Sequence, residues 1–344
     1  MFLASLPPNT PFTLTIIGTQ PHTPAALITT LNELLTTAQT DSLLTHTETL
    51  TQHSPTSNST STIHLTYWPT TSYQTWSTSP AVTTFFSTLP DTAGIYREAL
   101  TIHPDRIQGA SNHNTPSGCM HMGKIELHPN LSGYWGCYPD RIAEKNITCP
   151  FSTDHITTTT TNDPSPSSSP ENTSKIIPGK KTLTTIPNNL CFVIEGQDHT
   201  AASETEKSYW TENFDSLAQE WVSQALDAGV KKGVLSSRAC YNPSASSSSS
   251  SSSTTPQRNT YPLTLTRDIQ LLYFLDLDHM ENLGRTNVAH VKLRKSFMEA
   301  YGPGGVMFPG GLKLWVETAV LRDGDFEAEY VGCLEGTGLM GLKF

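Results

Sequence analysis

The chain has 344 residues, of which 36% are hydrophobic and only 15% charged, and its formal net charge is −10. An acidic chain without a run of lysine or arginine is a poor partner for nucleic acid, so we expect no nucleic-acid binding. No apolar stretch approaches the length of a membrane span, and Pro7 and Pro8 interrupt the short apolar start of the chain. We therefore expect a cytoplasmic protein with no signal peptide and no membrane association.

The first 156 residues alternate between strand and helix patterns. Runs of apolar and β-branched residues predict strands, and helical periodicity predicts helices between them. The predicted strands are 12–18, 62–68 and 94–103, and the predicted helices are 24–38 and 72–89.

Serine, threonine and proline crowd two later segments, 157–178 and 242–259. Neither segment has enough apolar surface to offset the entropy lost on ordering. We expect residues 157–178 to form a flexible linker between two domains, 1–156 and 179–344. The serine-rich stretch 242–259 is expected to be a disordered loop inside the second domain.

The second domain repeats the alternation of strands and helices. The predicted strands are 189–196, 231–241, 261–277, 311–321 and 325–333, and the predicted helices are 207–229 and 278–302. Each half then approximates a β-α-β-β-α-β set. The pattern predicts an α+β fold of two ferredoxin-like halves with antiparallel sheets.

His290 lies at the centre of the predicted helix 278–302. Counting from it in steps of three and four along that helix face gives neighbours that are mostly apolar or small: Leu283, Thr286, Leu293 and Phe297. An imidazole in this position is either a core histidine bonded to a neighbour or a ligand of a metal or haem. The six cysteines form no C-x-x-C pair, which argues against a structural zinc site.

Seven segments of the chain resemble, in the same order, the aldoxime dehydratases, a family that includes the phenylacetaldoxime dehydratases. The segments are TYWPTTSYQTWSTSPAV, GIYREALTIHPDRI, GYWGCYPDRI, NLCFVIEGQD, DHMENLGRTNVAH, LKLWVETAVL and YVGCLEGTG. These enzymes are haem-containing lyases that convert an aldoxime, R–CH=N–OH, into a nitrile and water. The resemblance implies two halves of the dimeric α+β barrel type, with a haem b between sheet and helix. It also implies a small-molecule substrate, an arylacetaldoxime or an alkyl aldoxime.

The resemblance gives His290 a role as the proximal ligand of the ferrous haem iron. In the family, a histidine in a His-hydrophobic-Glu start is followed eleven residues later by the ligand, and His279, Glu281 and His290 keep that spacing. On one continuous helix the two histidines would share a face about 16 Å apart, so only one could bind a given iron. His279, at the helix start, suits capping or a supporting hydrogen bond.

The opposite side of the expected haem pocket departs from the family. The family's proton donor is a histidine in a strand motif close to LWHEV, whereas this chain reads LWVET and has Val316 at that position. Strand alternation places Leu312, Leu314 and Val316 on one side, which predicts an apolar wall. Losing a positioned general acid typically costs a factor on the order of 10²–10⁴ in rate.

Other family positions are kept in part. The family's serine falls in LSSR, so either Ser236 or Ser237 faces the pocket, unless the position is an ordinary strand serine. An arginine of the family appears as Lys181, which keeps the charge but loses the planar fork, and a glutamate is replaced by Gly133. Lys181 and His199 are the candidates for a replacement acid, and the alternative for His199 is a solvated loop histidine.

Three functions stay open. The first, which we favour, is an aldoxime dehydratase active in nitrile biosynthesis with a rearranged acid. The second is a haem-binding member of the family with lost or altered catalysis, and the third is an α+β scaffold without haem. We expect a monomer or a homodimer, because exposed edge strands can pair within one chain or between chains.

Overall fold

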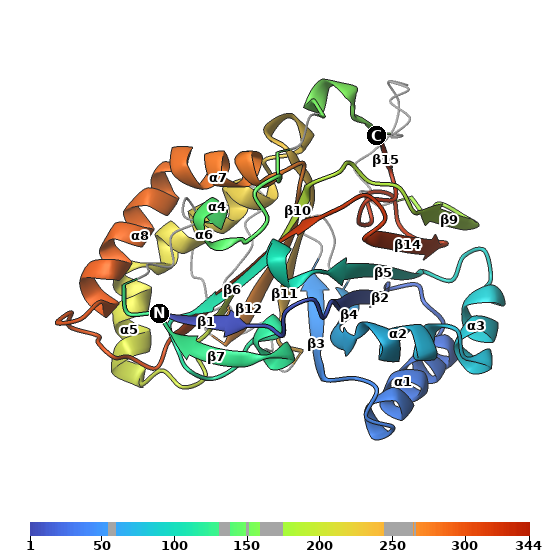
Figure 1. Cartoon of the computed structure of the whole chain (residues 1–344), viewed down its shortest axis with the longest axis horizontal. Coiled ribbons are helices and arrows are strands. Elements are labelled where there is room, and N and C mark those ends of the chain that lie inside the picture. Colours follow the sequence, from blue (N-terminus) through green and yellow to red (C-terminus); the bar gives the residue numbers. More distant parts are fainter. Residues whose placement is uncertain (54–59, 131–137, 149–150, 159–174, 244–263, 265) are drawn as a thin grey trace, which may run out of the picture.

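A computed structural model describes residues 1–53, 60–130, 138–148, 151–158, 175–243, 264 and 266–344 (Figure 1). Gly133, most of the expected linker and nearly all of the expected serine-rich loop lie outside these ranges. The division into two domains at residues 157–178 therefore stays a prediction.

Among the described residues, the N-terminal part has four central strands with three helices beside them, and a short fourth helix, α4 (Tyr138–Arg141), follows later in the chain. The helices are α1 (Ala25–Thr40), α2 (Thr70–Ser77) and α3 (Pro80–Ser87). The strands are β2 (Phe12–Thr19), β3 (His46–His53), β4 (Thr60–Pro69) and β5 (Ile95–Ile102). They pair in the order β3-β4-β2-β5, and each pairing is antiparallel. Strand β3 was absent from the prediction because its polar residues, HTETLTQH, give only a weak apolar alternation.

The C-terminal part repeats this order of elements. Its helices are α5 (Glu204–Asn213), α6 (Asp215–Leu226), α7 (Leu277–Thr286) and α8 (Val288–Tyr301). Its strands are β10 (Leu190–Asp198), β11 (Val234–Tyr241), β12 (Arg267–Phe274) and β13 (Lys313–Leu321). They pair antiparallel in the order β13-β10-β12-β11. The predicted α+β class with antiparallel strands is confirmed.

Short strands from each part extend the strands of the other. These are β1 (Phe2–Ser5), β6 (Ile107–Ser111), β7 (Lys124–Leu127), β9 (Lys180–Leu183) and β14 (Phe326–Val331). Strand β6 pairs with β13, β14 pairs with β5, and β11 meets β3. Within the described residues, the result is one 13-stranded sheet in the order β7-β1-β6-β13-β10-β12-β11-β3-β4-β2-β5-β14-β9.

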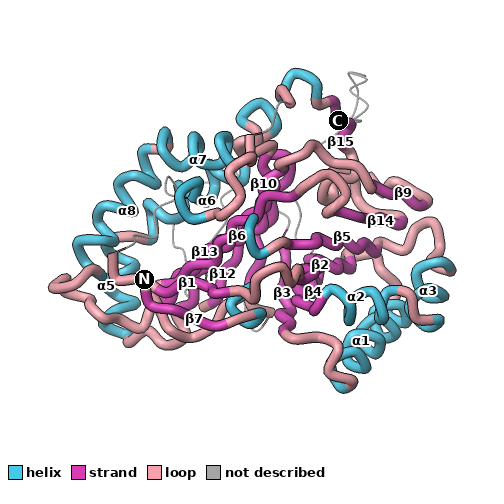
Figure 2. Tube along the Cα trace, in the orientation of Figure 1, coloured by secondary structure: helices cyan, strands magenta, loops and turns pink. Residues whose placement is uncertain are grey.

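The strands have an inner side and an outer side, and each side forms its own core. The inner core joins both parts, with Leu14 and Tyr67 packed in one cluster with Phe192 and Tyr273. The outer sides are covered by helices, α1 to α3 over one part and α5 to α8 over the other, which Figure 2 shows as two separate groups in cyan. None of the described helices is long and apolar enough to cross a membrane.

Buried charges tie the two parts together on the inner side. Arg238 of β11 donates through Nη1 to the Glu98 carboxylate of β5 at 3.0 Å, and the Tyr273 and Tyr330 hydroxyls donate to the same carboxylate at 2.9 Å each. Glu98 and Arg238 are both buried. Such a pair fixes the position of the two parts relative to each other. A shift that separated Arg238 from Glu98 would leave both charges buried and uncompensated.

Three predicted helices are each divided in two. The stretch 72–89 becomes α2 and α3, because Ser79 caps the second helix and Pro80 begins it. Residues 207–229 give α5 and α6, which meet at Phe214. Residues 278–302 fall in α7 and α8, which are separated by Asn287 in an extended conformation. The distance of about 16 Å expected for one straight helix therefore does not apply to His279 and His290.

Candidate active site

His290 occupies the first turn of α8, and its main chain is fixed by the residue that caps this helix. Asn287 is the N-cap of this helix, and its side-chain Oδ1 accepts a hydrogen bond from the His290 backbone N–H at 2.9 Å. Asn287 also donates through its amide to Gln224 of α6 at 2.6 Å. The imidazole is thus attached to a helix end that is itself tied to a neighbouring helix.

The ring of His290 is oriented by the break between α7 and α8. Its Nδ1 lies 2.8 Å from the carbonyl oxygen of Gly284, in the last turn of α7. A carbonyl in a helix's last turn lacks a partner within its own helix and is available to such a donor. Since a carbonyl only accepts, this bond places the proton on Nδ1 and the lone pair on Nε2, the form in which imidazole binds a metal.

The surroundings of His290 keep the ring neutral. The side chain is buried, and its ring centroid lies 4.4 Å from that of Trp221 of α6. Burial lowers the pKa of His290, and the bond to the Gly284 carbonyl opposes that shift only in part. A buried, neutral and oriented imidazole fits an axial ligand of haem iron.

Val316 lies on the outer side of β13, beneath the helices. It packs in the same apolar cluster as Trp221 and Val193, while Leu312 and Leu314 pack in the next cluster with Trp210. The outer side of β13 therefore carries apolar side chains from residue 312 to 316, as strand alternation indicates.

The two candidate serines face opposite sides of β11. Ser237 pairs with Leu272, an outer-side residue, and Ser236 pairs with Tyr273, an inner-side residue. Ser237 is therefore the serine on the same side as His290. Its hydroxyl donates to the carbonyl oxygen of Leu226, the last residue of α6, at 2.7 Å.

Lys181 lies on an edge strand of the sheet, far from His290. It belongs to β9, the outermost strand beside β14, where it pairs with Tyr330 and is exposed. Figure 1 shows β9 and α8 at opposite sides of the molecule. The structure does not bring Lys181 and His290 together.

His199 is not the solvated loop residue that its position after β10 suggests. The side chain is fully buried, and its ring lies edge-on to Trp210 with a centroid separation of 4.9 Å. Burial lowers the pKa of His199 to about 4, so the ring is neutral at pH 7 and is a weak proton donor. Neither ring nitrogen has a hydrogen-bond partner among the described residues.

Sequence reasoning missed Trp221, which packs against His290, and Glu195, which contacts Trp221. The indole Nε1 of Trp221 donates to Oε2 of Glu195 at 3.3 Å, and the same indole packs against His290. Glu195 could have been singled out as the one charged residue within the apolar strand sequence LCFVIEG.

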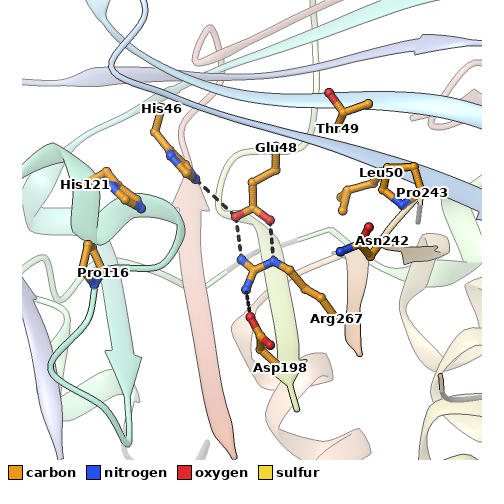
Figure 3. Close-up of a pocket in the computed structure, with 10 residues that line it drawn as sticks. All are labelled: His46, Glu48, Thr49, Leu50, Pro116, His121, Asp198, Asn242, Pro243 and Arg267. Carbon is orange, nitrogen blue, oxygen red and sulfur yellow. Dashed lines mark hydrogen bonds and ion pairs between the residues drawn. The ribbon is translucent and has the colours of Figure 1, made fainter. Parts of the chain in front are cut away.

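A polar cavity of about 400 Å³ lies on the inner side, away from His290. Figure 3 shows Glu48 at its centre, bonded to His46 and to Arg267, which also reaches Asp198. Burial alone would raise the pKa of Glu48, but the hydrogen bonds from His46 and Arg267 outweigh it and lower this pKa to about 2. None of the residues proposed from the sequence lines this cavity.

Comparisons with known proteins identify the family and the fold. The model of a family described as haem-containing dehydratase matches residues 15–339. A crystal structure of the aldoxime dehydratase OxdRE in complex with butyraldoxime is similar in fold, with a TM-score of 0.75 and 18% identity, covering 98% of this chain and 88% of that one. A second aldoxime dehydratase structure gives a TM-score of 0.72 and 16% identity, covering 98% of this chain and 90% of that one. Among curated protein sequences, none matches the chain significantly. Because the family model spans nearly the whole chain, this protein belongs to the haem-containing dehydratases.

Proposed function

We propose that the chain dehydrates aldoximes to nitriles and water, with His290 as the protein ligand of a haem b. The observation that carries this proposal is the buried His290 ring, whose Nδ1 bond to the Gly284 carbonyl leaves the lone pair on Nε2. Support for the substrate class comes from the butyraldoxime complex of the structurally similar enzyme.

His290 and the residues around it would have separate roles in such a site. His290 would hold the haem, and a bound ferrous haem would supply a Lewis-acidic iron for the oxime nitrogen. The apolar cluster that includes Val193, Val316 and Val320 limits the access of water, so that charge interactions act in a low dielectric. Of the two candidate serines, Ser237 is the one whose hydroxyl lies on this side and could orient an oxime, provided its bond to the Leu226 carbonyl breaks.

A His290→Ala variant tests the proposal, with His279→Ala as the matched control. The two histidines belong to neighbouring helices, but the His279 ring bonds to Asp276 at 2.7 Å rather than to a carbonyl of α7. Purified proteins would be loaded with haem, reduced anaerobically with dithionite and mixed with phenylacetaldoxime, with phenylacetonitrile quantified. We expect His290→Ala to lose both the ferrous Soret spectrum of the wild type and nitrile formation above free haem. We expect His279→Ala to keep both.

Nitrile formation by His290→Ala at the wild-type rate would contradict the role of His290. A second candidate function, haem binding without dehydration, is favoured by the apolar side chain of Val316 beneath the helices. That candidate would be supported by a wild-type protein with a normal ferrous spectrum that forms no nitrile.

A further inference from the structure

The carboxyl group of Glu195 lies on the helix-covered side of the sheet. Side chains on β10 alternate, so Glu195 shares its side with Cys191 and Val193, both members of the outer core beneath the helices. Glu195 is mostly buried but keeps a small exposed fraction, although β10 is flanked by β12 and β13. Space at least as large as a water molecule therefore adjoins it.

Glu195 is joined to His290 through a single side chain. The Trp221 indole donates to the Glu195 carboxylate at 3.3 Å and lies against the His290 ring at 4.4 Å between centroids. In the sheet, Glu195 is the direct cross-strand partner of Val316. Direct partners project to the same side with Cβ atoms about 5 Å apart, so the carboxyl reaches the region that the side chain at position 316 adjoins.

The environment of Glu195 favours a protonated carboxyl group that can donate a proton over a carboxylate held in an ion pair. Within the described part of the chain it forms no ion pair, and the indole N–H of Trp221 is its hydrogen-bond donor. Burial raises the pKa of Glu195 to about 7, and the Trp221 bond works against that shift. A group with this pKa is substantially protonated at neutral pH and can both give and take a proton.

We propose that Glu195 is the catalytic acid of this site, donating the proton that lets the aldoxime hydroxyl leave as water. The inference rests on the proposed aldoxime dehydration and adds the group that supplies its proton.

This step is balanced in protons and electrons and needs no added reactant. The Glu195 carboxylic acid protonates the hydroxyl oxygen, and the N–O bond breaks with its electron pair on the departing water. The C–H electron pair of the aldoxime then forms the third bond between carbon and nitrogen, and its proton returns to the Glu195 carboxylate. The net change is R–CH=N–OH to R–C≡N and H₂O, with no net oxidation or reduction.

Glu317 offers a matched control in the neighbouring strand. Burial raises its pKa to about 7 as well, but it faces the inner side, where the Tyr67 hydroxyl and the Cys119 backbone N–H each donate to it at 2.9 Å. It is therefore a buried carboxyl of similar protonation that cannot reach the His290 side. Glu195→Gln and Glu317→Gln make the same chemical change on opposite sides of the sheet.

The first measurement is the C–O stretching frequency of carbon monoxide bound to the reduced, haem-loaded proteins, followed from pH 5 to 9. This frequency responds to hydrogen-bond donors near the bound gas. We expect a pH-dependent band with a midpoint near 7 in the wild type and in Glu317→Gln, and no such transition in Glu195→Gln. Other titratable or charged groups on this side, among the described residues, include Tyr138, Arg141, Cys191, His199, Asp268, Asp276, Glu281, His290 and Arg294. The Glu195→Gln comparison separates their contributions from that of Glu195.

The second measurement is turnover of phenylacetaldoxime. We expect Glu195→Gln to lower kcat by about 10²–10⁴-fold, with little change in the aldoxime affinity measured by optical titration. Trp221→Phe provides an independent test that keeps the carboxyl. Because it removes a donor that favours the charged form, it should move the midpoint of the carbon monoxide band to higher pH.

The outcomes separate this inference from the proposed function. An unchanged band and unchanged turnover in Glu195→Gln would overturn the role of Glu195 while leaving dehydration intact. A wild-type protein that forms no nitrile but shows the Glu195-dependent band would overturn the proposed function and support the position of the acid. A midpoint that does not move in Trp221→Phe would count against Glu195 as the titrating group.

Discussion

Single side chains at this site owe their protonation to burial and to the groups packed around them. The Gly284 carbonyl and burial together favour a neutral His290 with its proton on Nδ1. Burial beneath the covering helices raises the pKa of Glu195, whereas burial near Trp210 lowers that of His199. Burial disfavours the charged form in every case, so it favours a protonated carboxyl and a neutral imidazole.

Position 316 allows a test of the acid at the residue scale. In a Glu195→Gln background, Val316→His would place an imidazole directly across from position 195 on the same side of the sheet. We expect this double variant to form phenylacetonitrile at least about tenfold faster than Glu195→Gln alone, because a positioned acid contributes about 10²–10⁴ in rate.

The control for this prediction is Val320→His in the same background. Val320 shares the side of Val316 but lies four residues along β13, where its partner is Cys191. Equal rates for Glu195→Gln with and without Val316→His, at equal haem loading, would show that no acid at this wall assists the reaction.

At the scale of elements, the break between α7 and α8 is the feature that orients His290. It provides the cap of α8 and releases the Gly284 carbonyl to orient His290. A single uninterrupted helix would bond that carbonyl to the backbone N–H four residues on and leave the imidazole without its acceptor. The sequence GRTNVAH contains the signal for the break, because asparagine is a preferred N-cap.

Asn287→Ala should weaken both the fold and the site. We expect it to lower the free energy of unfolding by about 0.5–2 kcal/mol, the usual cost of losing an N-cap, and to weaken haem binding. Urea unfolding followed by circular dichroism and haem titration would measure the two effects. Asn287→Asp keeps the cap acceptor but not the amide that bonds Gln224, so it should retain most of the stability. An Asn287→Ala protein as stable as the wild type would refute this account.

At the scale of the whole molecule, ionic contacts on the inner side join the two parts of the chain. Arg267 of β12 donates to Glu48 of β3 through Nε and Nη2 at 2.8 Å each, and the Glu48 side chain is 10% exposed. The lowered pKa of Glu48 makes this contact sensitive to acid. The folded-state pKa of about 2 lies below the ordinary value of 4.5, so ionised Glu48 stabilises the fold above about pH 4.5.

Stability should therefore fall as the pH drops from about 4.5 toward 2, and Glu48→Gln should remove part of that fall. A shift of this size corresponds to at most about 3 kcal/mol at neutral pH. Urea midpoints measured between pH 3 and 6 would show it, with Glu212→Gln on the exposed side of α5 as a control for the change in net charge. Parallel pH curves for the wild type and Glu48→Gln would rule out this contribution.

Local pattern identified most of the central strands and helices, because each is long enough to show its own periodicity. It failed for β3 and for the short edge strands, whose pairing depends on partners far away in the sequence. The side of each residue on a strand also followed from alternation, as for Leu312, Leu314 and Val316. The bulge of β11 between Val234 and Ser236 had to be seen before Ser237 could be assigned to the outer side.

The sequence by itself determined the α+β class and the antiparallel strands. Through family resemblance it also identified His290 as the candidate haem ligand. Tertiary structure decided which groups share the space around it. It placed Lys181 on a remote edge strand and brought Glu195, Trp221 and His290 together from β10, α6 and α8. The reason is physical: periodicity reports which side of an element is buried, but the partner buried against it is set by packing between elements distant in the chain.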